Sequence, residues 1–202
     1  INGSNVAPDA MNDAIGANED TVTNGDVLAN NGNGVDEDAN GDTLTVTQIN
    51  GSAANVGLPV TLSGGGRVTL QSNGQFSFDP NGSYESLAVG ESAVETFDYT
   101  IEDGNGGSDT ATVTLTIAGA NDAPVGVTDN ASTDEDNSTS GDVLDNDTDV
   151  DGTDTLVVSE VGGSSLSVGM AASTTGGGSI TLQADGTFTY APGTAFTALG
   201  VN

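Results

Sequence analysis

Apolar and polar residues alternate along several short stretches of the chain. Residues 97–101 read Phe-Asp-Tyr-Thr-Ile, and residues 111–117 read Ala-Thr-Val-Thr-Leu-Thr-Ile. A period of two is typical of a strand that buries one face, and Thr, which fills most of the polar positions, favours strands. Clusters of Gly, Asn and Asp separate the stretches and predict turns. Since no segment shows a sustained period of 3.6, the sequence predicts an all-β, antiparallel architecture.

An internal repeat organises the chain. Residues 64–71 reappear at 176–183 at an offset of 112 positions, and residues 25–28 (Gly-Asp-Val-Leu) reappear at 141–144 at an offset of 116. Self-similarity of this kind indicates tandem domains. The change of offset indicates an insertion in the first copy, within residues 31–42.

We predict three parts from this repeat: the end of a preceding repeat at residues 1–4, a first repeat at 5–119 and a second repeat at 120–202. The second copy has no counterpart of the alternating stretches 97–101 and 111–117. We therefore expect the chain to be a window from a longer array, in which the second repeat lacks its last two strands.

Each full repeat, at about 115 residues with about seven strands, has the size of an immunoglobulin-like sandwich. The sequence therefore predicts tandem antiparallel β-sandwiches, with Phe76, Phe78, Phe97 and Tyr99 in the core between the sheets. In the first repeat we expect strands at residues 9–15, 25–28, 43–49, 66–71, 75–79, 96–102 and 109–117.

Charge and composition exclude several classes of function. The chain carries 30 acidic residues, one Arg, no Lys and no His, so its formal net charge is −29. One cation cannot neutralise a row of phosphates or hold the chain to an anionic membrane, and no apolar run approaches the length of a membrane span. Without His or Cys, a Ser-His-Asp triad, a Cys nucleophile and a thiolate or imidazole zinc site are excluded. Oxygen ligands alone select hard cations, calcium above all.

Four short motifs occur in register with the repeat. They lie at residues 121–124 (Asn-Asp-Ala-Pro), 134–136 (Asp-Glu-Asp), 141–152 (Gly-Asp-Val-Leu-Asp-Asn-Asp-Thr-Asp-Val-Asp-Gly) and 103–109 (Asp-Gly-Asn-Gly-Gly-Ser-Asp). Together they resemble VCBS and bacterial cadherin-like tandem repeats, and the resemblance covers essentially the whole chain. It implies an extracellular, calcium-dependent stalk of a large secreted bacterial protein, notably an RTX-type adhesin. It also implies calcium at the domain junctions, with neighbouring repeats of the same chain as partners.

Three acidic segments are expected to meet at one end of each sandwich: the entry segment, the loop after the second strand, and the hairpin between the last two strands. Carboxylates about 4 Å apart repel by roughly 4 kcal/mol at an effective dielectric constant of about 20, so we predict that Ca²⁺ joins them. The candidate ligands of the first repeat are Asn5, Asp36, Asp38, Asp42 and Asp103. Those of the second repeat are Asn121, Asp122, Asp147, Asp149, Asp151 and Asp154. Glu19 and Asp20, with Glu91, are expected to approach the second junction from the far end of the first repeat.

A simpler interpretation of these acids stays open, in which they are solvated turns where Asp and Asn only cap the backbone. The first copy also departs from the second, because Val6 stands where the second copy has Asp122 and the loop around residues 31–42 is longer. We therefore expect the upstream junction to bind calcium more weakly, or with a different geometry.

Other functions compete with a structural role. A carbohydrate-binding module needs exposed aromatic residues, but the chain has no Trp and its aromatic residues are assigned to the core. A glycosidase with paired carboxylates is disfavoured because no insertion forms a cleft, and 30 acids produce chance pairs. A filament subunit that takes its missing strands from a like chain would cover the open sheet edges. We predict a non-enzymatic extracellular extender that supports cell adhesion and biofilm formation.

Overall fold

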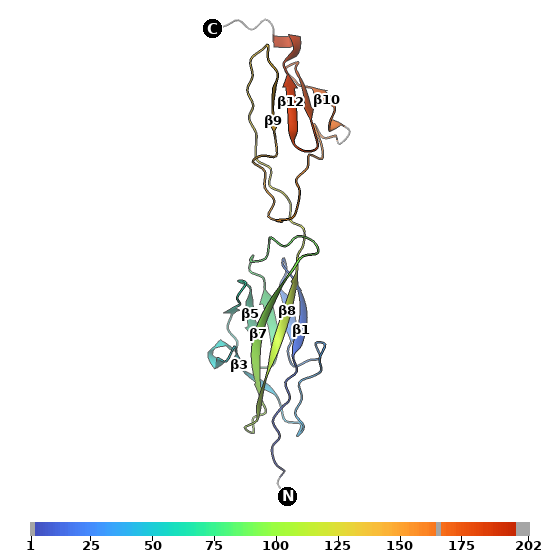
Figure 1. Cartoon of the computed structure of the whole chain (residues 1–202). Coiled ribbons are helices and arrows are strands. Elements are labelled where there is room, and N and C mark those ends of the chain that lie inside the picture. The colour runs from blue at the N-terminus through green and yellow to red at the C-terminus, as the bar shows by residue number, and fades with distance from the viewer. Residues whose placement is uncertain (1–2, 165–166, 197–202) are drawn as a thin grey trace. The chain divides into compact units, whose positions relative to one another are not determined.

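The computed structural model describes residues 3–164 and 167–196 (Figure 1). The chain divides into two compact units, Ile1–Asn121 and Asp122–Asn202. The regular elements of the described residues are strands and short 3₁₀ turns, among them η1 (Ala53–Asn55) and η3 (Gly193–Phe196). The predicted all-β architecture is confirmed.

The first unit contains two four-stranded sheets. One sheet has the order β1 (Asp13–Asn18), β8 (Ser108–Ala118), β7 (Ser92–Glu102) and β3 (Thr45–Ile49). The other has the order β2 (Thr23–Asp26), β6 (Gln75–Asp79), β5 (Arg67–Leu70) and β4 (Val60–Thr61). The long hairpin of β7 and β8 pairs along its whole length, because both strands continue the alternation that their sequences show.

The core of the first unit lies between these sheets. On β8, Val113, Leu115 and Ile117 are buried, while the Thr residues between them are half-buried or exposed. Phe76 of β6 and Phe97 of β7 meet edge to face across the core, with ring centroids 6.5 Å apart. The prediction that the aromatic residues of the first repeat are core residues is confirmed.

The first strand differs from its prediction at 9–15, since it begins only at Asp13. Residues 9–11 make other bonds: Asp9 pairs with Glu37, the Ala10 amide donates to Asp109 Oδ2 at 2.8 Å, and the Met11 amide donates to a loop carboxylate. The amides of Ala10 and Met11 thus donate to side chains instead of to the carbonyls of a neighbouring strand. β1 then pairs in parallel with β8, whereas every other strand pair of this sheet is antiparallel.

The second unit forms one antiparallel sheet within residues 122–164 and 167–196. Its order is β10 (Ala171–Ser173), β11 (Ser179–Leu182), β12 (Thr187–Ala191) and β9 (Thr139–Asp142). By the repeat offset these strands correspond to β4, β5, β6 and β2. In the first unit β1 and β3 pair with β8 and β7, so their counterparts here have no hairpin to join within the described residues. Phe188 and Tyr190 of β12 are accordingly only half-buried, whereas their counterparts Phe76 and Phe78 are buried.

Candidate cation-binding loops

Three predicted ligands of the first unit come together at one end of its sandwich. One carboxylate oxygen each of Asp38, Asp42 and Asp103 lies within 4.8 Å of the others. Asp38 and Asp42 belong to the loop between β2 and β3, and Asp103 directly follows β7. We call these three residues the entry cluster.

Each loop of the entry cluster is shaped by a carboxylate that caps backbone amides. Asp38 Oδ1 accepts from the amides of Asn40 (2.7 Å) and Asp42 (3.2 Å). Asp103 Oδ1 accepts from the amides of Asn105 (2.7 Å) and Gly107 (2.9 Å). One oxygen of Asp38 and one oxygen of Asp103 therefore cap their turns, as the simpler interpretation of these acids predicts. Asp103 Oδ2 accepts from Asn5 instead, and Asp38 Oδ2 has no hydrogen-bond partner.

Asparagine side chains tie the entry segment and the loops together. Asn5 Nδ2 donates to Asp103 Oδ2 at 2.7 Å, Asn105 Nδ2 donates to Asp42 Oδ2 at 2.8 Å, and the amide of Val6 donates to Asn40 Oδ1 at 2.7 Å. The hydrogen bond from Asn5, helped by the loop amides, holds the pKa of Asp103 below its usual value. Asp103 is therefore ionised at neutral pH.

Asp38 Oδ2 supports the interpretation of the entry cluster as a cation site. This oxygen is buried and has no hydrogen-bond partner. A buried carboxylate oxygen without a donor or a cation is costly, and the only Lys or Arg of the chain, Arg67, lies on β5. The three side chains of the entry cluster offer carboxylate oxygens, which are the ligands that calcium prefers. The residues of the entry cluster therefore fit a calcium ion.

Asp36, another predicted ligand of the first repeat, is outside the entry cluster. It is buried, and its two oxygens accept from the Met11 amide at 2.7 Å and the Tyr99 hydroxyl at 2.7 Å. Asp36 therefore faces the core, although it lies only two residues before Asp38 in the same loop.

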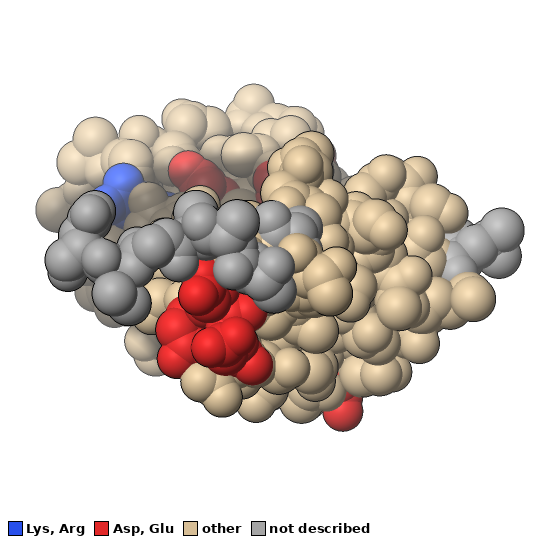
Figure 2. Space-filling model, turned by 90° about the horizontal axis from the view of Figure 1, so that it is seen from above, with Lys and Arg blue, Asp and Glu red and all other residues tan. Residues whose placement is uncertain are grey.

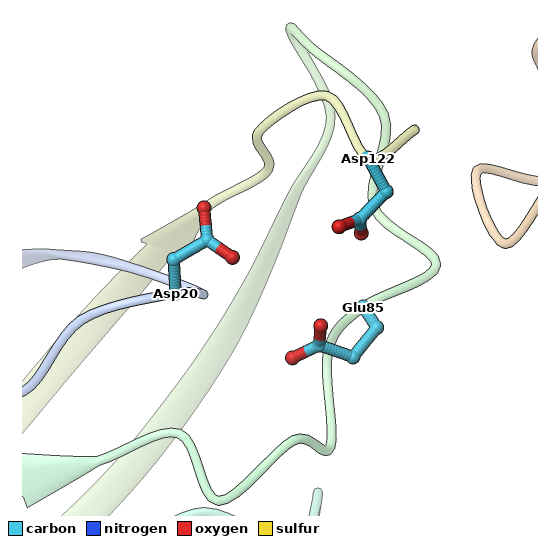
Figure 3. A group of neighbouring side chains, drawn as sticks. All are labelled: Asp20, Glu85 and Asp122. Carbon is cyan, nitrogen blue, oxygen red and sulfur yellow. The ribbon is translucent and has the colours of Figure 1, made fainter. Parts of the chain in front are cut away.

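A second acidic group comprises Asp20, Glu85 and Asp122, whose nearest carboxylate oxygens lie within 4.8 Å of one another (Figure 3). Asp20 lies in the turn after β1, Glu85 lies in the turn after β6, and Asp122 directly follows residue 121. Glu85 was not predicted from the sequence, because its equivalent in the second copy is Thr197 and the repeat comparison does not single it out. A screen of the turns beside the linker for every acid would have found it.

Two other acids predicted near residue 120 have local roles. Glu19 is buried; its Oε1 accepts from the Ala120 amide at 2.5 Å, and its Oε2 is buried without a hydrogen-bond partner. Glu91 caps its own turn, since its Oε2 accepts from the Ala88 amide at 3.1 Å.

The acidic loop of the second unit follows the same plan as the loop of the first. The Asp122 amide donates to Asp151 Oδ2 at 2.8 Å, and the Asp151 amide donates to Asp149 Oδ1 at 3.0 Å. Asp147 Oδ1 accepts from the Val127 amide at 2.7 Å, while the Asp154 amide donates to the Asp151 carbonyl at 3.0 Å. Asp151 is buried, and its Oδ1 has no hydrogen-bond partner.

These bonds define which residues of the two loops are equivalent. Asp147 binds an entry amide as Asp36 does, Asp149 caps the loop as Asp38 does, and Asp151 takes the place of Asn40. The second loop therefore has a carboxylate where the first has an amide. In the part of the chain that the structure describes, Asp147, Asp149 and Asp154 do not belong to a close group of three acids.

The family model of the bacterial cadherin-like domain matches residues 5–119 and 121–201. The chain belongs to the bacterial cadherin-like domain family. The two matches lie in tandem, and they confirm the resemblance that the four sequence motifs indicated. No curated protein sequence matches the chain.

Solved structures match this cadherin-like chain, and one of them matches over part of its length. That structure is a nucleoside hydrolase-related hypothetical protein from Saccharophagus degradans that is associated with carbohydrate metabolism, at 15% sequence identity and a TM-score of 0.35. The match covers 57% of the cadherin-like chain and 26% of the other protein.

Some acids of the cadherin-like chain are gathered on its surface. On the face shown in Figure 2, several acidic side chains form a dense patch and a few others lie apart from it, while most of the remaining visible surface is neither acidic nor basic. Cadherin-like domains generally bind calcium, and the acidic groups described above could hold a metal ion. Within the described residues, no helix has the length and apolar character needed to cross a membrane.

Proposed function

We propose that this chain is a structural extender of a secreted or surface-anchored bacterial adhesin or fibre. In this proposal, calcium ions bound by the loop carboxylates stiffen the repeats, and the stiffened array supports cell adhesion and biofilm formation. The tandem family matches support a repeat role, since domains of this family are usually extracellular and in general non-enzymatic.

The entry cluster is the observation that carries the proposal. Three carboxylates converge within 4.8 Å, and one of their oxygens, Asp38 Oδ2, is buried without a donor. Two such charges about 4 Å apart repel by roughly 4 kcal/mol at an effective dielectric constant of about 20. A calcium ion held by Asp38, Asp42 and Asp103 would replace this repulsion with attraction.

The hydrogen bonds around the entry cluster suggest how an ion would stiffen the repeat. Asn5 is bonded to Asp103 and the Val6 amide to Asn40, so the entry segment is attached to both loops that carry the acids. An ion that orders these loops would therefore also fix the segment through which the chain enters the first unit.

We extend the proposal to the residues around the linker at 119–122. In the first unit, Glu19, Asp20, Glu85 and Asn121 would supply oxygen ligands, and in the second unit, Asp122, Asp149, Asp151 and Asp154 would do so. Two buried oxygens without hydrogen-bond partners, Glu19 Oε2 and Asp151 Oδ1, support the assignment.

Calcium titration of the whole chain tests the proposal. With free calcium at about a hundred times its dissociation constant, each site adds about 2.7 kcal/mol to the free energy of unfolding, so calcium is expected to raise the melting temperature above its value in EDTA. Asp38→Asn and Asp103→Asn are expected to remove the calorimetric binding event of the entry cluster.

Asp98→Asn is the matched control for these variants. Asp98 is exposed on β7, and its side-chain Oδ1 accepts from Thr112 Oγ1 at 2.7 Å, a bond that the amide oxygen of Asn can keep. This variant should bind calcium like the wild type. Equal melting temperatures and equal maximum dimensions by small-angle scattering, with calcium and with EDTA, would contradict the proposal.

A filament assembled by strand exchange is a second candidate. Its support is the apolar hollow of the second unit, which is lined by Val143, Ile180, Phe188 and Tyr190 among others and corresponds to the buried core of the first unit. Sedimentation velocity distinguishes the two proposals, because strand exchange requires oligomers that grow with protein concentration, whereas an extender repeat stays monomeric.

A further inference from the structure

The hydroxyl of Tyr99 joins three segments of the first unit that are far apart in sequence. Tyr99 lies on β7, and its side chain is 0% exposed. Its hydroxyl lies 2.7 Å from Asp36 Oδ2, 3.0 Å from the Met11 carbonyl oxygen and 3.2 Å from the Val27 carbonyl oxygen. Met11 lies before β1, Val27 follows β2, and Asp36 belongs to the loop between β2 and β3. One side chain of β7 thus contacts the entry segment, the end of β2 and the loop.

Asp36 extends this contact to the backbone of the entry segment. Its Oδ1 accepts from the Met11 amide at 2.7 Å, while its Oδ2 accepts from the Tyr99 hydroxyl. Of the three oxygens near that hydroxyl, Asp36 Oδ2 is the nearest and belongs to a carboxylate, so it attracts the hydroxyl proton most strongly. The two oxygens of Asp36 therefore hold the loop to the core instead of facing the entry cluster.

The bond between Tyr99 and Asp36 connects the two segments that supply the acids of the entry cluster. Asp38 and Asp42 follow Asp36 in the same loop, whereas Asp103 follows Tyr99 beyond the end of β7. The bond therefore fixes the separation of loop and strand close to the acids. A shift of the loop away from β7 would move Asp38 away from Asp103.

The loop is bonded to the β7–β8 hairpin at a second point, which is exposed. There Asn105 Nδ2 donates to Asp42 Oδ2 at 2.8 Å. Water competes for an exposed hydrogen bond, whereas a buried bond to a carboxylate is strengthened by the low local dielectric constant and is costly to break. Of these two bonds, the buried one between Tyr99 and Asp36 is expected to hold the loop more firmly.

The entry cluster needs such an anchor because its carboxylates repel one another. One carboxylate oxygen of each acid lies within 4.8 Å of the others. Without an ion, a loosely held loop would move outward and separate them. The binding of an ion would then include the free-energy cost of ordering the loop, whereas a loop that is held in place before binding avoids this cost. Anchoring the loop therefore increases calcium affinity.

The second unit contains the corresponding loop without a tyrosine contact. Asp147, the equivalent of Asp36, accepts from the Val127 amide at 2.7 Å as Asp36 accepts from Met11. Within residues 122–164 and 167–196, no tyrosine hydroxyl bonds to Asp147, which is half-buried, whereas Asp36 is buried. In the same residues, Asp147 and Asp149 do not belong to a close group of three acids. This loop is consistent with a need for the anchor.

We propose that Tyr99 and Asp36 are positioning residues of the entry cluster. Their bond holds the loop against β7, so that Asp38 and Asp42 lie close to Asp103 before calcium binds. This inference rests on the proposed binding of calcium by these three acids. Asp36 acts from the core instead of as a ligand, and Tyr99 acts through Asp36 without contacting the ion.

Calorimetric titration of the whole chain with calcium tests this role, and the event to follow is the one that Asp103→Asn removes. Tyr99→Phe keeps the ring and removes the hydroxyl, while Asp36→Ala removes its acceptor. Each is expected to raise the dissociation constant about tenfold, the effect of losing one buried hydrogen bond to a charged group. Asp36→Asn should keep the affinity within about twofold, because its amide can accept from Met11 and donate to the Tyr99 oxygen.

Tyr84→Phe is the matched control. The Tyr84 hydroxyl is also buried and donates to a carboxylate oxygen, Glu95 Oε1, at 3.0 Å, but this bond does not involve the loop. Both tyrosine substitutions should lower the melting temperature, and only Tyr99→Phe should weaken calcium binding by the entry cluster. The titrations are made at a temperature at which circular dichroism shows every variant to be folded.

The outcomes separate this inference from the proposed function. If the wild type shows no calcium binding that Asp103→Asn removes, both are wrong. If the wild type binds calcium and either Tyr99→Phe or Asp36→Ala binds it equally well, the positioning role alone is wrong. The role is also contradicted if Asp36→Asn loses as much affinity as Asp36→Ala, since Asp36 would then act through its charge, or if Tyr84→Phe loses as much as Tyr99→Phe. Should Tyr99→Phe not fold, the comparison of Asp36→Ala with Asp36→Asn decides.

Discussion

At the scale of single residues, Gly119 shows how tightly the exit of the first unit is packed. A Cβ atom at this position would overlap the carbonyl oxygens of Leu87 and Ala88, and these are backbone atoms that cannot rotate away. The Gly119 amide also donates to the Glu91 carbonyl at 3.0 Å, which fixes the position of the backbone. The turn at residues 84–91 and the exit of β8 can therefore approach each other only because residue 119 has no side chain.

We predict that Gly119→Ala destabilises the first unit by about 1–3 kcal/mol, because the turn at residues 84–91 must move to accept the methyl group. Denaturant unfolding measures the change. Gly16→Ala on β1 is the matched control, since a Cβ there meets nothing within 4 Å, and its effect should be small. If the two substitutions lowered the free energy of unfolding equally, the close approach at Gly119 would not contribute to stability.

At the scale of elements, the loop between β2 and β3 and the loop at residues 143–154 share one hydrogen-bonding plan but differ in charge. Asn40 accepts from the Val6 amide in the first unit, whereas Asp151 accepts from the Asp122 amide in the second. Because the number of charged ligands sets the affinity of a calcium site, this position is expected to tune binding. The sequence predicts weaker calcium binding at the upstream site because Val6 stands where the second copy has Asp122. Asn40, which is uncharged where the second loop has Asp151, is a second reason to expect weaker binding there.

We predict that Asn40→Asp increases the calcium affinity of the entry cluster by about an order of magnitude, because it adds a carboxylate and keeps the acceptor for Val6. Isothermal titration calorimetry measures the change. Asn73→Asp adds the same charge in the turn between β5 and β6, where the side chain caps the Gln75 amide at 3.1 Å, and should leave the affinity unchanged. If both variants bind calcium equally well, net charge rather than loop position determines affinity.

The predicted and observed strands differ in ways that show which elements an alternating pattern can locate. Alternation predicted β6 at residues 75–79 to the residue and located β5, β7 and β8, because strands that bury one face must alternate. It missed β4, whose two residues are too short for a pattern. It also placed β1 too early, because the amides of residues 10 and 11 donate to side-chain acceptors that lie far away in sequence instead of to a neighbouring strand.

The candidate site was predictable where topology alone decides it. The convergence of Asp38, Asp42 and Asp103 follows from which loops share one end of a sandwich. The inward direction of Asp36 does not, since an irregular loop has no fixed period to orient its side chains. Glu85 was missed because its position has no acidic equivalent in the second copy.

At the scale of the whole molecule, the net charge of −29 acts against the folded state. Self-repulsion between carboxylates weakens as salt shortens the screening length, which falls from about 30 Å at 0.01 M to about 10 Å at 0.1 M. We predict that sodium chloride raises the melting temperature in EDTA, and that calcium at the same ionic strength raises it further. A calcium effect that matched the sodium effect would indicate general screening instead of ion binding by the loops.

The parallel pairing of β1 with β8 has a mechanical consequence. These are the first and last strands of the first unit, and six residue pairs join them, from Asp13 with Val113 to Asn18 with Ala118. Tension along the polypeptide enters at the start of β1 and leaves at the end of β8, so it slides one strand along the other. The rungs of the ladder then bear the load together, whereas an antiparallel pair of terminal strands would open one rung at a time. In a repeat that is pulled from both ends, this pairing loads the terminal strands in shear.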